Sequence, residues 1–399
     1  MKTPSNNVAA SVSAPATAFE LLQWQEQDKA STALWRTGSS LPKPRRIEIA
    51  DDTMPADTAF RHISEGASLL WRGDFQNARQ LLLALGRRLD KKSRRKPSAA
   101  AGFPHAFHLF RQTQAQRARM LASLLIELDE HWHCSLRRAP DWRVACSESW
   151  GTVAVQAEAR TVLVPLRDLL GVVGAHEWRK KGVEIAALDG ARIHAHYGVF
   201  SPVRGEYLDL VMRAPLPAAG VSQAWDIGTG TGVLAAVLLK RGVKSVVATD
   251  MSERALACAG ENLQRLGQAA KVELQRTDLF PQGQAGLIVC NPPWLPGKAA
   301  SLLDQAIYDE DSRMLRGFLQ GLAMHLLPGG EGWLVISDLA EHLKLRSREE
   351  LLAWIASAGL KVLGREDIRP HHGKVQDQTD PLHAARAAEV TSLWRLAAA

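Results

Sequence analysis

Short apolar runs alternate with helical patterns over the C-terminal half of the chain, and this alternation constrains the fold more than any other feature. Runs of strand length occupy seven segments: 224–227, 245–249, 271–276, 286–290, 332–337, 360–365 and 390–396. Helical spacings of apolar residues lie between them, at 233–240, 253–266, 303–326 and 348–358. Such alternation is typical of a parallel sheet with helices on both faces. The sequence therefore predicts a doubly wound, Rossmann-like α/β domain of seven strands over residues 201–399.

The first 200 residues show other patterns and predict three further regions. Residues 1–55 begin with small and polar residues and are expected to form a poorly ordered lead-in, with a short helix over 20–35. Residues 56–150 have helical spacings of apolar residues, which predict a small helical domain. These spacings cover 58–89 and 107–128. Residues 151–200 contain strand-like stretches and are expected to form a short β-rich linker.

The composition narrows the class of protein. A chain of 399 residues with 46% hydrophobic residues is ordinary for a globular protein of about two to three domains. Four cysteines without a CxxC pair form no disulfide framework, so a reducing, cytoplasmic location is expected. No apolar signal segment and no apolar run of about 18 residues occurs, so no membrane partner is expected. The composition does not indicate an oligomeric state.

Basic charge is concentrated in one short stretch. The formal net charge is +7, and seven of the ten residues from Arg87 to Lys96 are basic. Such a run forms either a solvated helix end or a patch that contacts the phosphates of a nucleic acid. The second interpretation makes RNA a candidate partner.

A glycine-rich turn follows the first strand of the C-terminal domain. It contains Gly228, Gly230 and Gly232 and is preceded by Asp226. Glycines permit a tight turn and let a ligand approach the backbone closely. The dinucleotide fingerprint requires a glycine at position 233, where this chain has Val233, so the turn indicates another ligand.

Polar side chains also follow the next strands. Asp250 ends the second strand, and a carboxylate there can accept two hydrogen bonds from a ribose diol. Asp278 and Leu279 follow the third strand, where the acid can accept from an adenine amino group and the leucine can pack against the ring. Because ligands bind at the carboxyl ends of parallel strands, these residues are expected to meet in one crevice.

The fourth strand ends in Asn291-Pro292-Pro293-Trp294, which is the most informative motif. The Asn291 side-chain carbonyl and the Pro292 carbonyl can both accept from one NH2 group, and the consecutive prolines fix the backbone. Trp294 offers a face on which a planar group can stack. The motif is suited to holding an amide or an exocyclic amine in line with an electrophile.

Together these motifs resemble class I S-adenosylmethionine-dependent methyltransferases, specifically the small methyltransferase group with an Asn-Pro-Pro-aromatic motif. The resemblance covers residues 198–396. It implies that the glycine turn lies against the methionine part of S-adenosyl-L-methionine, that Asp250 binds its ribose and that Asp278 lies near its adenine. It also implies that Asn291, Pro292 and Trp294 are catalytic and that Pro293 contacts the substrate.

The segment before the first strand adds to this resemblance. Phe200 belongs to a Tyr-Gly-Val-Phe-Ser-Pro stretch similar to the leading segment of the small methyltransferase group. Arg204 and Glu206 match two positions of the Pro-Arg-Pro-Glu-Thr-Glu segment of protein glutamine N5-methyltransferases, although Gly205 and Tyr207 depart from it. The resemblance implies that Phe200, Arg204 and Glu206 contact the substrate.

The motifs predict a methyltransferase that acts on a planar NH2 nitrogen. The first hypothesis is a base in RNA, either adenine N6 or guanine N2. The alternative is the side-chain amide of a protein glutamine, and a non-enzymatic reading is a binding protein with a vestigial fold. No metal site is predicted, since His131, His133 and Cys134 do not share one face of a strand. His371 and His372 are candidates for a substrate-contacting loop.

Overall fold

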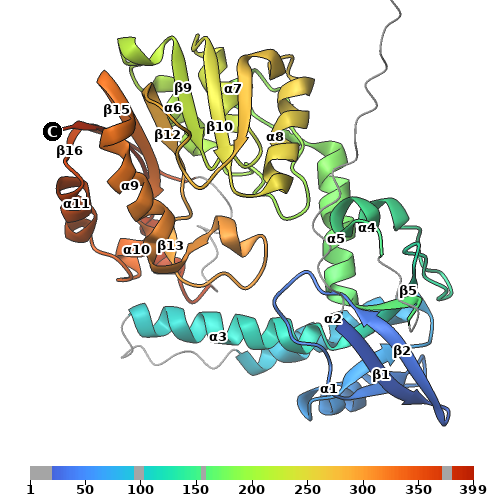
Figure 1. Ribbon diagram of the computed structural model, residues 1–399. Coiled ribbons are helices and arrows are strands. Elements are labelled where there is room, and N and C mark those ends of the chain that lie inside the picture. The colour runs from blue at the N-terminus through green and yellow to red at the C-terminus, as the bar shows by residue number, and fades with distance from the viewer. Residues whose placement is uncertain (1–19, 94–102, 154–158, 371–379) are drawn as a thin grey trace, which may run out of the picture.

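The computed structural model describes residues 20–93, 103–153, 159–370 and 380–399, which form two α/β domains (Figure 1). The N-terminal domain is built on a six-stranded sheet and the C-terminal domain on a seven-stranded sheet. Among the described residues, no helix is both long and apolar enough to cross a membrane.

The N-terminal sheet has the strand order β1-β2-β6-β5-β4-β3. Its strands are β1 (Glu20–Glu26), β2 (Lys29–Trp35), β3 (Ile47–Ala50), β4 (Ser68–Trp71), β5 (Leu124–Asp129) and β6 (Thr161–Pro165). The helices of this half are α1 (Ala56–Ser64), α2 (Phe75–Ser93), α3 (Phe103–Leu121), α4 (Arg143–Trp150) and α5 (Leu166–Lys181). A core of buried side chains from helices and strands fills this domain.

Three predictions for this half are wrong. The lead-in predicted over 1–55 is not poorly ordered over residues 20–50, which supply β1, β2 and β3 of the sheet. The segment 20–35 is an antiparallel hairpin, because Leu22 and Trp24 alternate with exposed residues and Gln27 and Asp28 take the positive φ angles of a tight turn. Residues 56–150 do not form a purely helical domain, because β4 and β5 lie between the helices. All four residues of β4 are buried, so the strand has no alternating pattern that would separate it from a helix.

The predicted linker is divided between the two domains. Strand β6 is an inner strand of the N-terminal sheet, and α5 leads from it to the C-terminal domain. The short strands β7 (Val183–Glu184) and β8 (Arg192–Ile193) pair with each other. Ile185 and Ile193 are buried in the core of the C-terminal domain, which therefore extends upstream of the predicted start at residue 201.

The C-terminal domain confirms the predicted α/β fold. Its sheet has the order β11-β10-β9-β12-β15-β17-β16, with only β17 antiparallel to its two neighbours. The strands are β9 (Gln223–Ile227), β10 (Ser245–Asp250), β11 (Val272–Arg276), β12 (Ala285–Cys290), β15 (Leu326–Ser337), β16 (Leu360–Ile368) and β17 (Thr391–Ala398).

Helices cover both faces of this sheet. One face carries α6 (Glu206–Arg213), α7 (Val233–Lys240) and α8 (Glu253–Arg265), and the other carries α9 (Arg313–His325) and α11 (Arg348–Ser357). Successive residues of a strand point to opposite faces of the sheet: Val289 packs in the core with α6, α7 and α8, and Ile288 packs in the core with α9 and α11. This arrangement leaves the carboxyl edge of the parallel strands open to a ligand.

Candidate active site

The carboxyl ends of four adjacent strands bring the predicted site residues to one edge of the sheet. Strands β11, β10, β9 and β12 are neighbours in that order, and all are parallel. Asp250 and Asn291 stand at the ends of β10 and β12, on either side of the glycine turn after β9. The main-chain NH of Gly230 donates to Asp250 Oδ2 at 3.1 Å, so the turn and the acid are in direct contact.

Positive φ angles explain the glycines of the turn. Gly228, Gly230 and Gly232 have φ angles of 73°, 55° and 79°, a region that side chains rarely adopt. At Gly228 a Cβ atom would lie 2.5 Å from Met314 Cε of α9. The main-chain NH groups of Gly228 and Thr229 both donate to the Thr249 carbonyl, which holds the turn against β10.

Asp226 is fully buried beneath this turn. Its Oδ2 accepts from Thr229 Oγ1 at 2.6 Å and from the NH of Ala235 at 3.1 Å, so the carboxylate ties the turn to α7. Its Oδ1 has no hydrogen-bond partner. Burial raises the pKa of Asp226 from 3.8 to about 6. Because buried polar atoms are normally hydrogen-bonded, this oxygen can accept a hydrogen bond from a ligand.

Asp250 has the geometry expected of a diol acceptor. Oδ1 accepts from the NH of Ser252 at 2.9 Å, and Oδ2 accepts from Gly230 as above. Each carboxylate oxygen has a second lone pair, so two acceptor positions remain for a pair of hydroxyl groups. Burial raises the pKa of Asp250, and its main-chain hydrogen bonds oppose that rise.

Asp278 lies at the same edge but is bound to a residue that the sequence did not single out as a partner. Arg313 Nη1 donates to Asp278 Oδ2 at 2.9 Å, and Nη2 donates to Oδ1 at 3.2 Å. Leu279 has a φ angle of 67°, and its carbonyl accepts from Thr249 Oγ1 at 2.7 Å. The bidentate pair anchors the start of α9 beside the predicted adenine position, and an adenine amino group would share Asp278 with Arg313.

Met314 at the start of α9 covers the glycine turn, and Asp309, ahead of the helix, caps it. Met314 lies over Gly228, and buried Asp309 accepts from the NH groups of Met314 and Leu315 at 3.0 and 3.1 Å. Asp309 thereby supplies acceptors for two main-chain NH groups in the first turn of α9, which have no partner within the helix. Nothing in the sequence spacing connects Arg313 to an acid 35 positions earlier.

The Asn-Pro-Pro-Trp segment lies directly after buried strand β12. Trp294 Nε1 donates to Asn291 Oδ1 at 2.8 Å, which orients the Asn291 amide. Pro292 is buried, Pro293 and Trp294 are half-buried, and the Trp294 ring packs against the core beneath α9. An amide oxygen accepts two hydrogen bonds, so Asn291 Oδ1 keeps one lone pair for a substrate NH2.

The predicted substrate contacts lie ahead of α6. Arg204 Nη1 is 3.9 Å from Glu389 Oε1, and the same oxygen accepts from Ser337 Oγ at 2.7 Å. Ser337 ends β15 and Glu389 precedes β17, so this group lies at the carboxyl edge, on the β15 side of Asn291. Phe200 is 38% exposed and Glu206 begins α6. A substrate role for these three residues stays a prediction.

Two other sets of residues were considered in the sequence. Among the described residues, no group of three or more His, Cys, Asp or Glu side chains is placed to hold a metal ion. His371 and His372 lie outside the described residues.

The donor and acceptor set fits S-adenosyl-L-methionine. Asp226 Oδ1 is a buried acceptor without a donor among the described residues, and Asp250 keeps two acceptor positions. These features match an amino acid group and a ribose diol. Asp278, Leu279 and Arg313 are the residues that would surround an adenine ring.

Comparisons with known proteins agree with this assignment. The sequence model of the methyltransferase small domain family matches residues 190–351. A release factor glutamine methyltransferase of Cereibacter sphaeroides is 37% identical over 120 residues, which are 26% of this chain and 43% of that protein. A ribosomal protein uL3 glutamine methyltransferase of Bordetella pertussis is 32% identical over 162 residues, covering 37% and 53% of the two chains.

A more distant relative is covered more fully. A putative protein N5-glutamine methyltransferase of Methanocaldococcus jannaschii is 27% identical over 163 residues, which are 39% of this chain and 80% of that protein. The chain spans 41% to 55% of the length of four release factor methyltransferases that it matches. Among solved structures, a ribosomal protein L11 methylase from Lactobacillus delbrueckii is 21% identical, with 52% and 86% of the chains covered and a TM-score of 0.34. Residues 190–351 are thus similar to the methyltransferase small domain family, in agreement with the fold and the site described above.

Proposed function

We propose that this protein transfers a methyl group from S-adenosyl-L-methionine to the side-chain amide nitrogen of a glutamine in another protein. The observation that carries the proposal is the Asn291-Pro292-Pro293-Trp294 segment at the end of β12, next to the glycine turn at the end of β9. The cofactor supplies an already activated methyl group, so the protein mainly has to align the nitrogen with it.

The chain's own residues account for that alignment. Asn291 Oδ1 and the Pro292 carbonyl accept from the two N–H bonds of the amide and point its nitrogen toward the cofactor. The same oxygens favour the positive charge that develops on the nitrogen. Transfer would form the bond between this nitrogen and the methyl carbon and break the carbon–sulfur bond, with S-adenosylhomocysteine as the leaving group. The nitrogen would then lose one proton to water, so no side chain has to act as a general base. Trp294 fixes the Asn291 amide and offers a face to the planar substrate group.

Protein glutamine is favoured over the RNA base that the sequence placed first. The relatives described above bear names that specify glutamine methylation. The RNA hypothesis depended on the basic run at 87–96, of which residues 87–93 form the end of α2. Within it, Arg88 donates to Asp57 at 2.7 Å and Asp90 accepts from Arg117 at 2.8 Å, so part of the run is committed to contacts within the domain.

The place of action follows from the cysteines. All four are buried and free, and the proposal therefore locates the protein in a reducing compartment such as the cytoplasm.

Labelling with tritiated cofactor tests the proposal. The purified protein is added to a lysate of cells that lack it, and the label is separated into protein and RNA fractions. We expect label in protein, recovered as N5-methylglutamine after enzymatic digestion, and no such product with the Asp250→Ala variant. Label confined to RNA would contradict the glutamine proposal, and no label in any fraction would contradict methyl transfer.

A further inference from the structure

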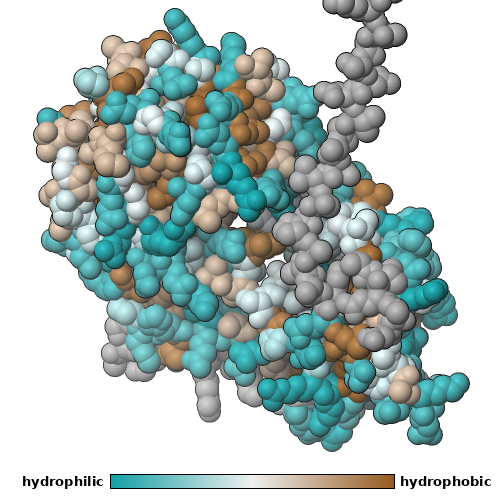
Figure 2. Space-filling model, in the orientation of Figure 1, coloured by the Kyte–Doolittle hydropathy of each residue, from teal (hydrophilic) through white to brown (hydrophobic). Residues whose placement is uncertain are grey.

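A cleft of about 880 Å³ separates the two domains. One wall comes from α3, α5 and the loop at 38–42, and the other comes from 197–203 and 300–308 of the C-terminal domain. Figure 2 shows a hollow between the two domains, with brown apolar surface beside it. Its volume lies within the range of typical ligand-binding clefts.

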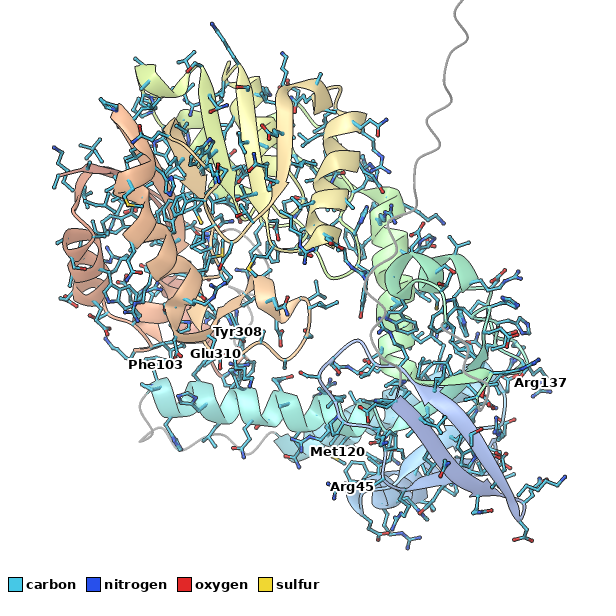
Figure 3. All side chains as sticks on the ribbon, viewed as in Figure 1. Arg45, Phe103, Met120, Arg137, Tyr308 and Glu310 are labelled. Carbon is cyan, nitrogen blue, oxygen red and sulfur yellow. The ribbon has the colours of Figure 1, made fainter. Side chains whose placement is uncertain are left out.

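The cleft borders the segment that follows Asn-Pro-Pro-Trp. Tyr308 lines it and pairs with Leu295, which directly follows Trp294. Arg111 of α3 donates to the Lys298 carbonyl at 2.5 Å, and its guanidinium lies 4.1 Å from the centre of the Tyr308 ring. Figure 3 shows Tyr308 and Glu310 close to the N-terminal part of α3. The N-terminal domain therefore supports the wall that continues from the Asn-Pro-Pro-Trp segment.

Large apolar side chains are exposed along this cleft. Trp178, Val203 and Leu303 line it and are 57%, 64% and 49% exposed. Their number and closeness distinguish this cleft from a surface with single scattered apolar residues, and such patches mark binding sites for other proteins.

The helical wall adds positive charge. Arg111, Arg119 and Arg167 line the cleft, and none of them has a carboxylate within ion-pair distance among the described residues. The two acids of the cleft are already engaged: Asp168 accepts from Thr37 Oγ1 and the NH of Gly38, and Asp304 accepts from the NH of Ala300. Because Arg111 already contacts Lys298 and Tyr308, Arg119 and Arg167 are the arginines that remain to meet an acidic partner.

We infer that this cleft receives an extended polypeptide segment of the substrate protein, with acidic side chains against the arginines and apolar side chains against Trp178, Val203 and Leu303. The inference rests on the proposed function and adds to it where the substrate docks and which side chains flank its glutamine. Polypeptide is favoured over RNA because the described residues of the basic run line no part of the cleft, and because the aliphatic side chains of Val203 and Leu303 offer nothing to phosphates or base edges.

Binding of short labelled probes tests the cleft. The probes are a fluorescein-labelled peptide with a central glutamine flanked by glutamate and leucine, the same peptide with lysine in place of glutamate, and a single-stranded RNA of equal length. Fluorescence anisotropy is measured with S-adenosylhomocysteine present. The cleft variant combines Arg119→Glu with Trp178→Ser, and a matched control combines Arg61→Glu with Val144→Ser, both exposed residues on α1 and α4 that do not line the cleft.

We expect the acidic peptide to bind the wild-type protein and the control equally, and to bind the cleft variant at least about tenfold more weakly, since Trp and Arg are frequent interface hot spots. The lysine peptide should bind more weakly to all three proteins. Equal binding by the cleft variant, absent binding by the wild type, or a preference for the RNA would each overturn the inference. Glutamine labelling in the lysate is scored separately, so a protein that binds the peptide without methylating glutamine would refute the proposed function alone.

Discussion

The hydrogen bond from Trp294 Nε1 to Asn291 Oδ1 can be removed without removing the aromatic ring. Trp294→Phe retains a planar face against the core beneath α9 but has no N–H to donate at the 2.8 Å contact. A neutral hydrogen bond contributes about 1 kcal/mol, which corresponds to roughly a fivefold change in the population of the oriented Asn291 amide. We therefore expect kcat to fall about fivefold while KM for the protein substrate changes little.

The assay is steady-state methyl transfer to the substrate protein identified by tritium labelling. Calorimetry gives the cofactor affinity of Trp294→Phe and of its control, and a thermal melt gives their stability. Trp354→Phe is the matched control, because Trp354 packs against the same core from α11 and lies away from the site. The control should retain the wild-type kcat. An unchanged kcat for Trp294→Phe, or a higher KM with kcat unchanged, would refute the orienting role of the indole N–H.

Three further changes address the cofactor site. Asp250→Ala removes the proposed diol acceptors and should weaken binding of S-adenosyl-L-methionine by about 1–3 kcal/mol in calorimetry, whereas unchanged affinity would exclude Asp250 from the site. Gly228→Ala places a methyl group at a φ angle of 73° and 2.5 Å from Met314 Cε. It should lower the free energy of unfolding by about 1–2 kcal/mol in urea titrations and weaken cofactor binding. Unchanged stability and cofactor affinity would show that the turn is not constrained at this position. Asp226 has a folded pKa of about 6 against a usual value of 3.8, so the folded state binds the proton more tightly and stability falls as pH rises from about 4 to 6. Asp226→Asn should flatten this fall, which amounts to about 3 kcal/mol at most, and an identical pH profile in denaturant titrations would show that the shift is absent.

Much of the C-terminal domain was predictable because its strands end in distinctive residues. The helix predicted over 233–240 matches α7, since Gly232 precedes it and the apolar run stops at Lys240. Asp226, Asp250 and Asn291 were predicted to meet because parallel strands present their carboxyl ends at one edge. The strands of the N-terminal half do not end in such distinctive residues. The buried strands β4 and β5 were therefore predicted as parts of helices.

Contacts between distant segments were beyond sequence patterns. The pair between Arg313 and Asp278 depends on how α9 begins, with Asp311 and Ser312 both at positive φ angles. The contact of Arg111 with Lys298 depends on how the two domains meet. No local spacing in the sequence predicts either contact, because both depend on how helices and strands pack against one another.

Turnover by Asn291→Ala is the most direct test of the claim that the Asn-Pro-Pro-Trp segment holds the nitrogen that is methylated. The change removes one of two acceptors that align this nitrogen and leaves Asp226, Asp250 and the glycine turn in place. Since a displacement of about 1 Å can cost about 100-fold in rate, we expect kcat to fall by about 100-fold or more, with cofactor affinity unchanged in calorimetry. Methyl transfer at the wild-type rate, with the cofactor bound as before, would contradict the account.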